Sequence, residues 1–159
     1  MKKAFVLFVS ACIGLLFGYA AITKLADYEN FRFGISESPF ISPFASVLAW
    51  LVPLTELVIV AFLLLSYTRL AGLYAASIVM FLFTVYIAAM LLFAIDIPCS
   101  CGGVLESMSW PAHLVFNAVF TVLSIAGVII ERKRRRMKNS ANLTNLTYAK
   151  RYFASPDTN

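Results

Sequence analysis

The chain has 159 residues, of which 61% are hydrophobic and 13% are charged, and its formal net charge is +5. This length corresponds to a single domain. The composition excludes an ordinary soluble domain, because apolar runs of about twenty residues recur, as in helices that cross a lipid bilayer. The positive charge does not indicate nucleic-acid binding. Six of the 13 basic residues lie in one cluster after an apolar run, Arg132–Arg136 with Lys138, which is typical of a juxtamembrane anchor.

The first apolar run covers residues 4–22 and follows a basic start. It resembles a secretory signal, but about nineteen residues span about 30 Å, which is enough to cross a bilayer. It also lacks a polar cleavage region, so we expect it to stay as the first membrane span. Cys12 lies inside this run, where core packing is the expected role. Gly14 and Gly18 form a GxxxG pattern, which allows another helix to approach closely.

A connection with several aromatic residues covers residues 24–44, and we expect it to lie on the membrane surface. The second span runs from about residue 45 to residue 65 and contains Glu56. A carboxylate at that depth is energetically costly, so it should face the bundle interior and have a partner. Tyr86 and Lys24 are the two candidate partners.

The third span covers about residues 71–95, and a turn at residues 98–109 leads to the fourth span, residues 110–130. Trp110 suits the membrane interface, and Pro111 suits the first turn of a helix. Polar residues recur in the fourth span at spacings of four, four and three, which places them on one helix face that should point inward: His113, Asn117, Thr121 and Ser124.

These features predict an all-α integral membrane protein, a four-helix bundle at residues 1–131. A basic juxtamembrane segment and a mobile polar tail are predicted at residues 132–159. Basic residues occur at the N-terminus, at Arg69 between the second and third spans, and after the fourth span. An even number of spans puts these segments on one side, which the positive-inside rule makes cytoplasmic. Both termini are then cytoplasmic, and the 98–109 turn faces outward, to the periplasm of a bacterium.

Cys99 and Cys101 form a Cys-x-Cys pair in that outward turn, followed by two glycines that leave the backbone accessible to a partner. The outside is where disulfides persist. A disulfide across so short a spacing closes a very small ring, and strained disulfides are the more oxidising ones. His113 is a candidate for favouring the reactive thiolate. Redox activity is therefore the favoured role of the pair, and a structural disulfide or half of a metal site are the alternatives.

The sequence resembles the MauE branch of the DoxX-like membrane proteins over roughly residues 4–130. The matching residues are Lys24-Leu25, Pro53-Leu54-Thr55-Glu56-Leu57, Cys99-Ser100-Cys101-Gly102-Gly103, Trp110, His113 and Asn117. The resemblance implies a four-helix membrane protein linked to thiol–disulfide chemistry, as in methylamine utilisation, where disulfide-rich dehydrogenase subunits mature outside the cytoplasm. The arrangement also looks like that of the vitamin K epoxide reductase-like proteins, which hold a quinone between their helices.

Three hypotheses follow. The first is a membrane thiol–disulfide oxidoreductase whose catalytic residues are Cys99, Cys101 and His113. Its partner would be a thioredoxin-like extracytoplasmic protein, and a quinone is the candidate cofactor, held near Glu56, Tyr86 and Asn117. The second is a metal-handling protein that uses the two cysteines and His113, although no metal site is assigned. The third is a structural accessory subunit that docks through its GxxxG face.

Overall fold

The computed structural model describes residues 2–93 and 109–154. Its elements are α1 (Lys2–Ala26), α2 (Tyr28–Ser36), the 3-10 turn η1 (Ser42–Phe44), α3 (Ala45–Leu64), α4 (Arg69–Phe93) and α5 (Trp110–Ala154). No strand occurs in these residues. Helices α1, α3, α4 and α5 are long and apolar enough to cross a membrane. The prediction of an all-α membrane protein with four spans is therefore confirmed.

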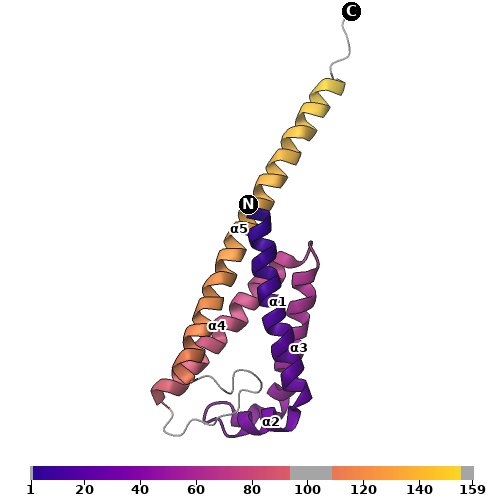
Figure 1. Ribbon diagram of the computed structural model, residues 1–159. Coiled ribbons are helices and arrows are strands. Elements are labelled where there is room, and N and C mark those ends of the chain that lie inside the picture. The colour runs from indigo at the N-terminus through magenta and orange to yellow at the C-terminus, as the bar shows by residue number, and fades with distance from the viewer. Residues whose placement is uncertain (1, 94–108, 155–159) are drawn as a thin grey trace, which may run out of the picture.

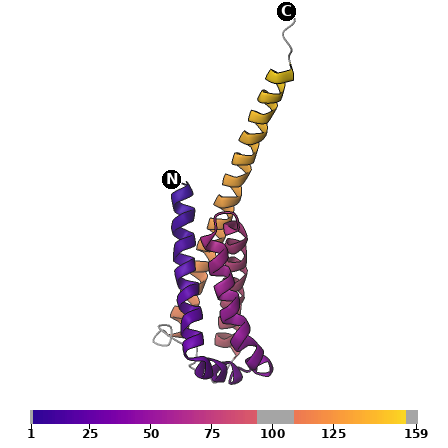
Figure 2. The same cartoon turned by 90° about the vertical axis from the view of Figure 1, so that its right-hand side faces the viewer.

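The four long helices form a bundle in which α1 packs against α3 and α5, and α4 packs against the same two helices. Figure 1 shows α2 lying across one end of the bundle, and Figure 2 shows the same arrangement from the side. We call this the α2 end. At the opposite end the second half of α5 projects well beyond the other helices. Apolar side chains cover the outer surface of the bundle, as expected of helices that face lipid.

Helix α2 lies against α3 because its apolar residues recur with helical spacing. Phe31 and Ile35 are four residues apart, and both are buried against Ala45 and Ala49 at the start of α3. This short helix and η1 cover the α2 end of the bundle. The connection at residues 24–44 therefore packs along the end of the bundle, and its predicted position on the membrane surface stays a prediction.

The half of the bundle away from α2 holds a closely packed core. Two glycines allow this packing, because a side chain at either position would lie unusually close to a neighbouring helix. A Cβ atom at Gly72 would lie 3.0 Å from the backbone nitrogen of Leu63 in α3. A Cβ atom at Gly127 would lie 3.3 Å from Leu73 in α4 and 3.3 Å from Val9 in α1. The GxxxG glycines of α1 differ, because a Cβ at Gly14 would meet nothing within 4 Å in the described residues.

An ionic network around the buried Glu131 joins α5 to the link between α3 and α4. Glu131 is 0% exposed and accepts hydrogen bonds from Arg134 at 2.7 Å and Arg135 at 3.1 Å. Arg135 also donates to the backbone carbonyls of Ser66 and Tyr67, at 3.0 and 3.1 Å. Carbonyls beyond the end of a helix commonly accept such bonds from arginine. The N-terminus lies at this end too, so the three basic segments share one end of the bundle, as the even number of spans predicts.

Helix α5 is longer than the sequence analysis predicts. We expect the fourth span to end near Ile130 and a mobile polar tail to follow, whereas α5 continues without a break to Ala154. The reason is local, because residues 128–154 contain no glycine or proline and include many strong helix formers such as arginine, lysine, leucine and alanine. Polarity alone is therefore a poor guide to where this helix ends.

Candidate functional site

The predicted redox pair, Cys99 and Cys101, lies outside the described residues. The helices on either side of it are described. α4 ends at Phe93 and α5 begins at Trp110, and both of these ends lie at the α2 end of the bundle. The chain segment that carries the two cysteines is thus attached at the α2 end, opposite the end with the basic network.

A cavity of about 450 Å³ lies between the helices next to the α2 end. Ligand sites for small molecules commonly have volumes of roughly 300–1,000 Å³ and mostly apolar walls with a few polar groups. Apolar residues from all four long helices and α2 make up most of this lining, among them Phe17, Ile35, Val52, Met80 and Ile87. The polar side chains that line it are Lys24, Glu56, Tyr86, His113 and Asn117.

Those five polar residues come from four helices that are far apart in the sequence. Every one of them is a candidate from the sequence: Glu56, Tyr86 and Asn117 for a cofactor, His113 for catalysis, and Lys24 as a partner of Glu56. The fold brings all five to the wall of a single cavity. Their chemistry is varied, because the set offers an ammonium, a carboxylate, a phenol, an imidazole and an amide.

Glu56 is buried in α3 and forms an ion pair with Lys24 at the end of α1. The Lys24 Nζ atom lies 2.5 Å from Glu56 Oε1, and the two side chains are 12% and 3% exposed. The expectation that this carboxylate faces inward and has a partner is confirmed, and of the two candidates Lys24 is the one that pairs with it. Glu56 Oε2 has no hydrogen-bond partner in the described residues.

Two aromatic rings flank the Lys24 ammonium. Its Nζ atom lies 5.7 Å from the centre of the Phe31 ring and 5.9 Å from the centre of the Phe83 ring. Both distances fall within the range of a cation–π contact. Phe31 and Phe83 also line the cavity, so the ammonium sits between its counter-ion and two apolar walls.

Tyr86 takes a partner that sequence analysis does not identify. Its hydroxyl donates to Ser38 Oγ at 2.9 Å. Ser38 lies in the turn after α2 and is 1% exposed. This bond ties the segment that covers the α2 end to α4. Ser38 cannot be found from the sequence, because a serine in a polar connection gives no sign of being buried.

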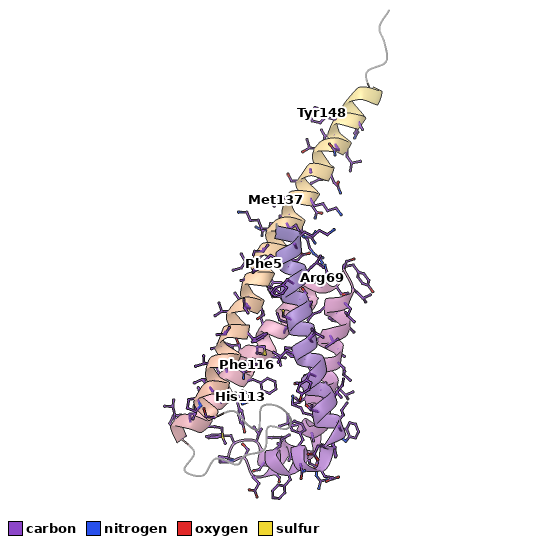
Figure 3. All side chains as sticks on the ribbon, in the orientation of Figure 1. Phe5, Arg69, His113, Phe116, Met137 and Tyr148 are labelled. Carbon is purple, nitrogen blue, oxygen red and sulfur yellow. The ribbon has the colours of Figure 1, made fainter. Side chains whose placement is uncertain are left out.

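The polar stripe of α5 points into the bundle, as its spacing predicts. All four of its residues are buried: His113, Asn117, Thr121 and Ser124. Figure 3 shows His113 and the neighbouring Phe116 near the α2 end, on the part of α5 that lines the cavity. Asn117 Nδ2 donates to the His113 carbonyl at 3.0 Å. Thr121 lies one turn further from the cavity, and its hydroxyl is 3.2 Å from that of Thr84 in α4.

The structure gives less support to a role for Cys12 or to a metal site. Cys12 is half-buried in α1, in the half of the bundle away from the cavity, and it is a free thiol. The described part of the chain holds no group of three histidine, cysteine or acidic side chains placed to bind a metal ion. Two of the three ligands considered for a metal site, Cys99 and Cys101, lie outside that part.

The arrangement can hold an apolar molecule with a polar head. The walls of the cavity would take an apolar body, and the five polar groups can donate or accept hydrogen bonds around a small polar group. Lys24 and Glu56 are held together at one place on the wall, which makes them the most strongly charged part of the cavity.

Comparison with known proteins agrees with this description. The family model described as methylamine utilisation protein MauE matches residues 2–130, which include all four long helices up to the basic cluster and every polar residue of the cavity. Neither the curated proteins nor the solved structures give a match. The match covers most of the chain, and we conclude that this integral membrane protein belongs to the MauE family.

Proposed function

We propose that the chain is a membrane thiol–disulfide redox protein. In this proposal Cys99 and Cys101 face the extracytoplasmic side and exchange electrons with a thioredoxin-like protein, as in the maturation of disulfide-containing proteins. The observation that carries the proposal is the cavity at the α2 end. It lies in the half of the bundle to which the cysteine segment is attached, and it collects five polar side chains in an otherwise apolar wall.

The exchange needs a route for both electrons and protons. Two thiols that close to a disulfide release two electrons and two protons, and the reverse step takes them up. The attacking group is the thiolate, formed when the thiol loses its proton. His113 is buried near the start of α5, the helix that follows the cysteines, and it lines the cavity. We propose that it favours the thiolate.

The cavity suits a quinone as the second redox group. Its volume of about 450 Å³ accommodates an aromatic ring, and its walls are mostly apolar. Lys24, His113 and Asn117 carry N–H groups, which can donate hydrogen bonds to the carbonyl oxygens of a quinone. A bound quinone would supply a two-electron, two-proton acceptor that is soluble in the bilayer. Glu56, Tyr86 and Asn117 would hold and orient it.

Orientation in a bacterial inner membrane follows from charge. The N-terminus, the link with Arg69 and the basic cluster of α5 share one end of the bundle. We propose that this end is cytoplasmic, by the positive-inside rule. The α2 end and the cysteine segment then face the periplasm, where a disulfide is not reduced by the cytosolic thiol pool.

Differential alkylation in isolated membranes tests the proposal. A Cys12→Ser chain leaves only the pair, so one sample is treated with mild reductant, another with mild oxidant, and both are labelled with a maleimide that adds mass. We expect two labels after reduction and none after oxidation. Equal labelling of the two samples would contradict the proposal.

Two further experiments identify the partner protein and test the metal-handling alternative. In Cys99→Ser or Cys101→Ser chains the remaining thiol cannot resolve a mixed disulfide, so we expect one of them to accumulate a covalent complex with a thioredoxin-like protein. Metal analysis of the purified protein separates the metal-handling alternative. A stoichiometric metal that disappears in the Cys99→Ser chain, with no change of thiol state in membranes, would favour that alternative.

A further inference from the structure

The Lys24–Glu56 pair lines the cavity and contains a buried hydrogen-bond acceptor that has no partner in the described residues. Glu56 uses Oε1 to pair with Lys24, while Oε2 is buried and has no partner in the described residues. Leaving a buried acceptor unpaired is unfavourable, because the water it loses on burial is not replaced. Glu131, the buried carboxylate at the other end of the bundle, uses both of its oxygens, on Arg134 and Arg135.

The pair also presents a donor and an acceptor close together. The ammonium of Lys24 has three N–H groups, and one of them is directed at Glu56 Oε1. The rings of Phe31 and Phe83 flank it and offer no conventional hydrogen-bond acceptor. A single oxygen atom of a ligand, bound beside this pair, would therefore meet a cationic donor and an anionic acceptor at once.

Structural stabilisation alone does not account for the pair. Replacing a buried ion pair by well-packed apolar side chains is often neutral or stabilising, and membrane helices gain little from burying charges. The core of the other half of the bundle is built mainly from apolar side chains. Ionisable residues inside membrane spans instead mark functional sites as a rule.

We propose that Glu56 Oε2 accepts a hydrogen bond from a hydroxyl group of the ligand in this cavity, with Lys24 holding the carboxylate in place. The cavity then takes an apolar aromatic molecule with a hydroxyl head, which is the reduced, phenolic form of a quinone-class carrier. This inference rests on the proposed function only because it treats the cavity as the site of an electron carrier. It adds that the cavity recognises the reduced form of that carrier, and that Glu56 Oε2 is the atom that recognises it.

Two naphthalenes that differ in one hydrogen-bond donor test the proposal. 2-Naphthol carries a hydroxyl group and 2-methoxynaphthalene carries a methyl ether in its place, and neither probe requires redox chemistry. Binding to the full chain in detergent is followed by the fluorescence of the probe. We expect the wild-type protein to bind 2-naphthol about 10- to 100-fold more tightly than the ether, as for a hydrogen bond to a charged group.

The matched variants locate the acceptor. In a Lys24→Met/Glu56→Leu double variant, which removes both charges together, we expect the preference for 2-naphthol to disappear. A Glu131→Gln variant removes a buried carboxylate from the opposite end and should keep the preference. Since the first comparison uses the wild-type protein alone, a variant that fails to fold does not prevent the test.

Two results would overturn the inference. One is a wild-type protein that binds the two naphthalenes equally or binds neither, and the other is a double variant that keeps the full preference. Neither result affects the alkylation of Cys99 and Cys101 in membranes, which tests the proposed function separately. If the thiols change redox state but the protein does not prefer 2-naphthol, only the inference is contradicted. If the protein prefers 2-naphthol but the thiols never change redox state, only the proposed function is contradicted.

Discussion

Replacing Lys24 with methionine is expected to destabilise the bundle strongly, because it leaves the Glu56 carboxylate buried without its counter-ion. The two side chains are 12% and 3% exposed, so water screens the pair little. Removing one partner of such a pair typically costs about 3–5 kcal/mol, and we expect about 3 kcal/mol of the free energy of unfolding to be lost. A Glu56→Leu variant, which leaves the Lys24 ammonium without its counter-ion, should lose about the same free energy of unfolding.

The double variant turns this expectation into a strict test. If the two residues acted independently, the losses would add to about 6 kcal/mol, whereas the double variant is expected to lose about 1 kcal/mol because no charge is left unpaired. Equilibrium unfolding of the purified protein in mixed detergent micelles measures all three variants. The reasoning is refuted if the Lys24→Met protein is as stable as the wild type, or if the double variant loses the sum of the two single losses.

Three other predictions concern packing and the ends of the helices. A Gly72→Ala chain should lose about 1–3 kcal/mol of stability, because the new Cβ would lie 3.0 Å from the backbone of α3, whereas Gly14→Ala, with nothing within 4 Å, should be neutral or stabilising. An Arg135→Gln chain should lose at least about 1 kcal/mol by giving up its ion pair with Glu131 and its hydrogen bonds to two carbonyls of the α3–α4 link, and the exposed Arg136→Gln change serves as its control. A Thr121→Val chain should lose about 0.6 kcal/mol by removing a hydroxyl contact with α4, yet bind 2-naphthol normally, because this residue does not line the cavity. The same unfolding assay measures each variant, and equal stability within each glycine or arginine pair would contradict the packing argument.

The sequence predicts the inner polar residues well because the bilayer makes exceptions conspicuous. Glu56 is a lone carboxylate in an apolar span, so an inward position and a partner can be inferred from the cost of exposing it to lipid. The α5 stripe follows from helical spacing alone. Lys24 can be named as a partner because it lies at the end of the first span, at a depth that its long side chain can reach.

Other features depend on tertiary contacts that no local pattern encodes. Phe31 lines the cavity and Ser38 bonds to Tyr86 only because α2 lies across the end of the bundle (Figure 1). The aromatic residues of this connection would fit a membrane-surface position equally well. The length of α5 could have been predicted from helix propensity, but its polar composition favours a tail in a membrane protein. Gly72 and Gly127 are visible in the sequence, yet only the packing of α3, α4 and α1 shows why these two positions need a residue without a side chain.

The central claim is that Cys99 and Cys101 change redox state on the outer side of the membrane. The most direct measurement labels intact spheroplasts that carry the Cys12→Ser chain with a membrane-impermeant maleimide, before and after a cycle of dithiothreitol and diamide. We predict that both thiols are labelled from outside after reduction, that neither is labelled after oxidation, and that a second reduction restores both. Labelling that appears only after the membrane is broken, or that is unchanged by the cycle, would contradict the claim.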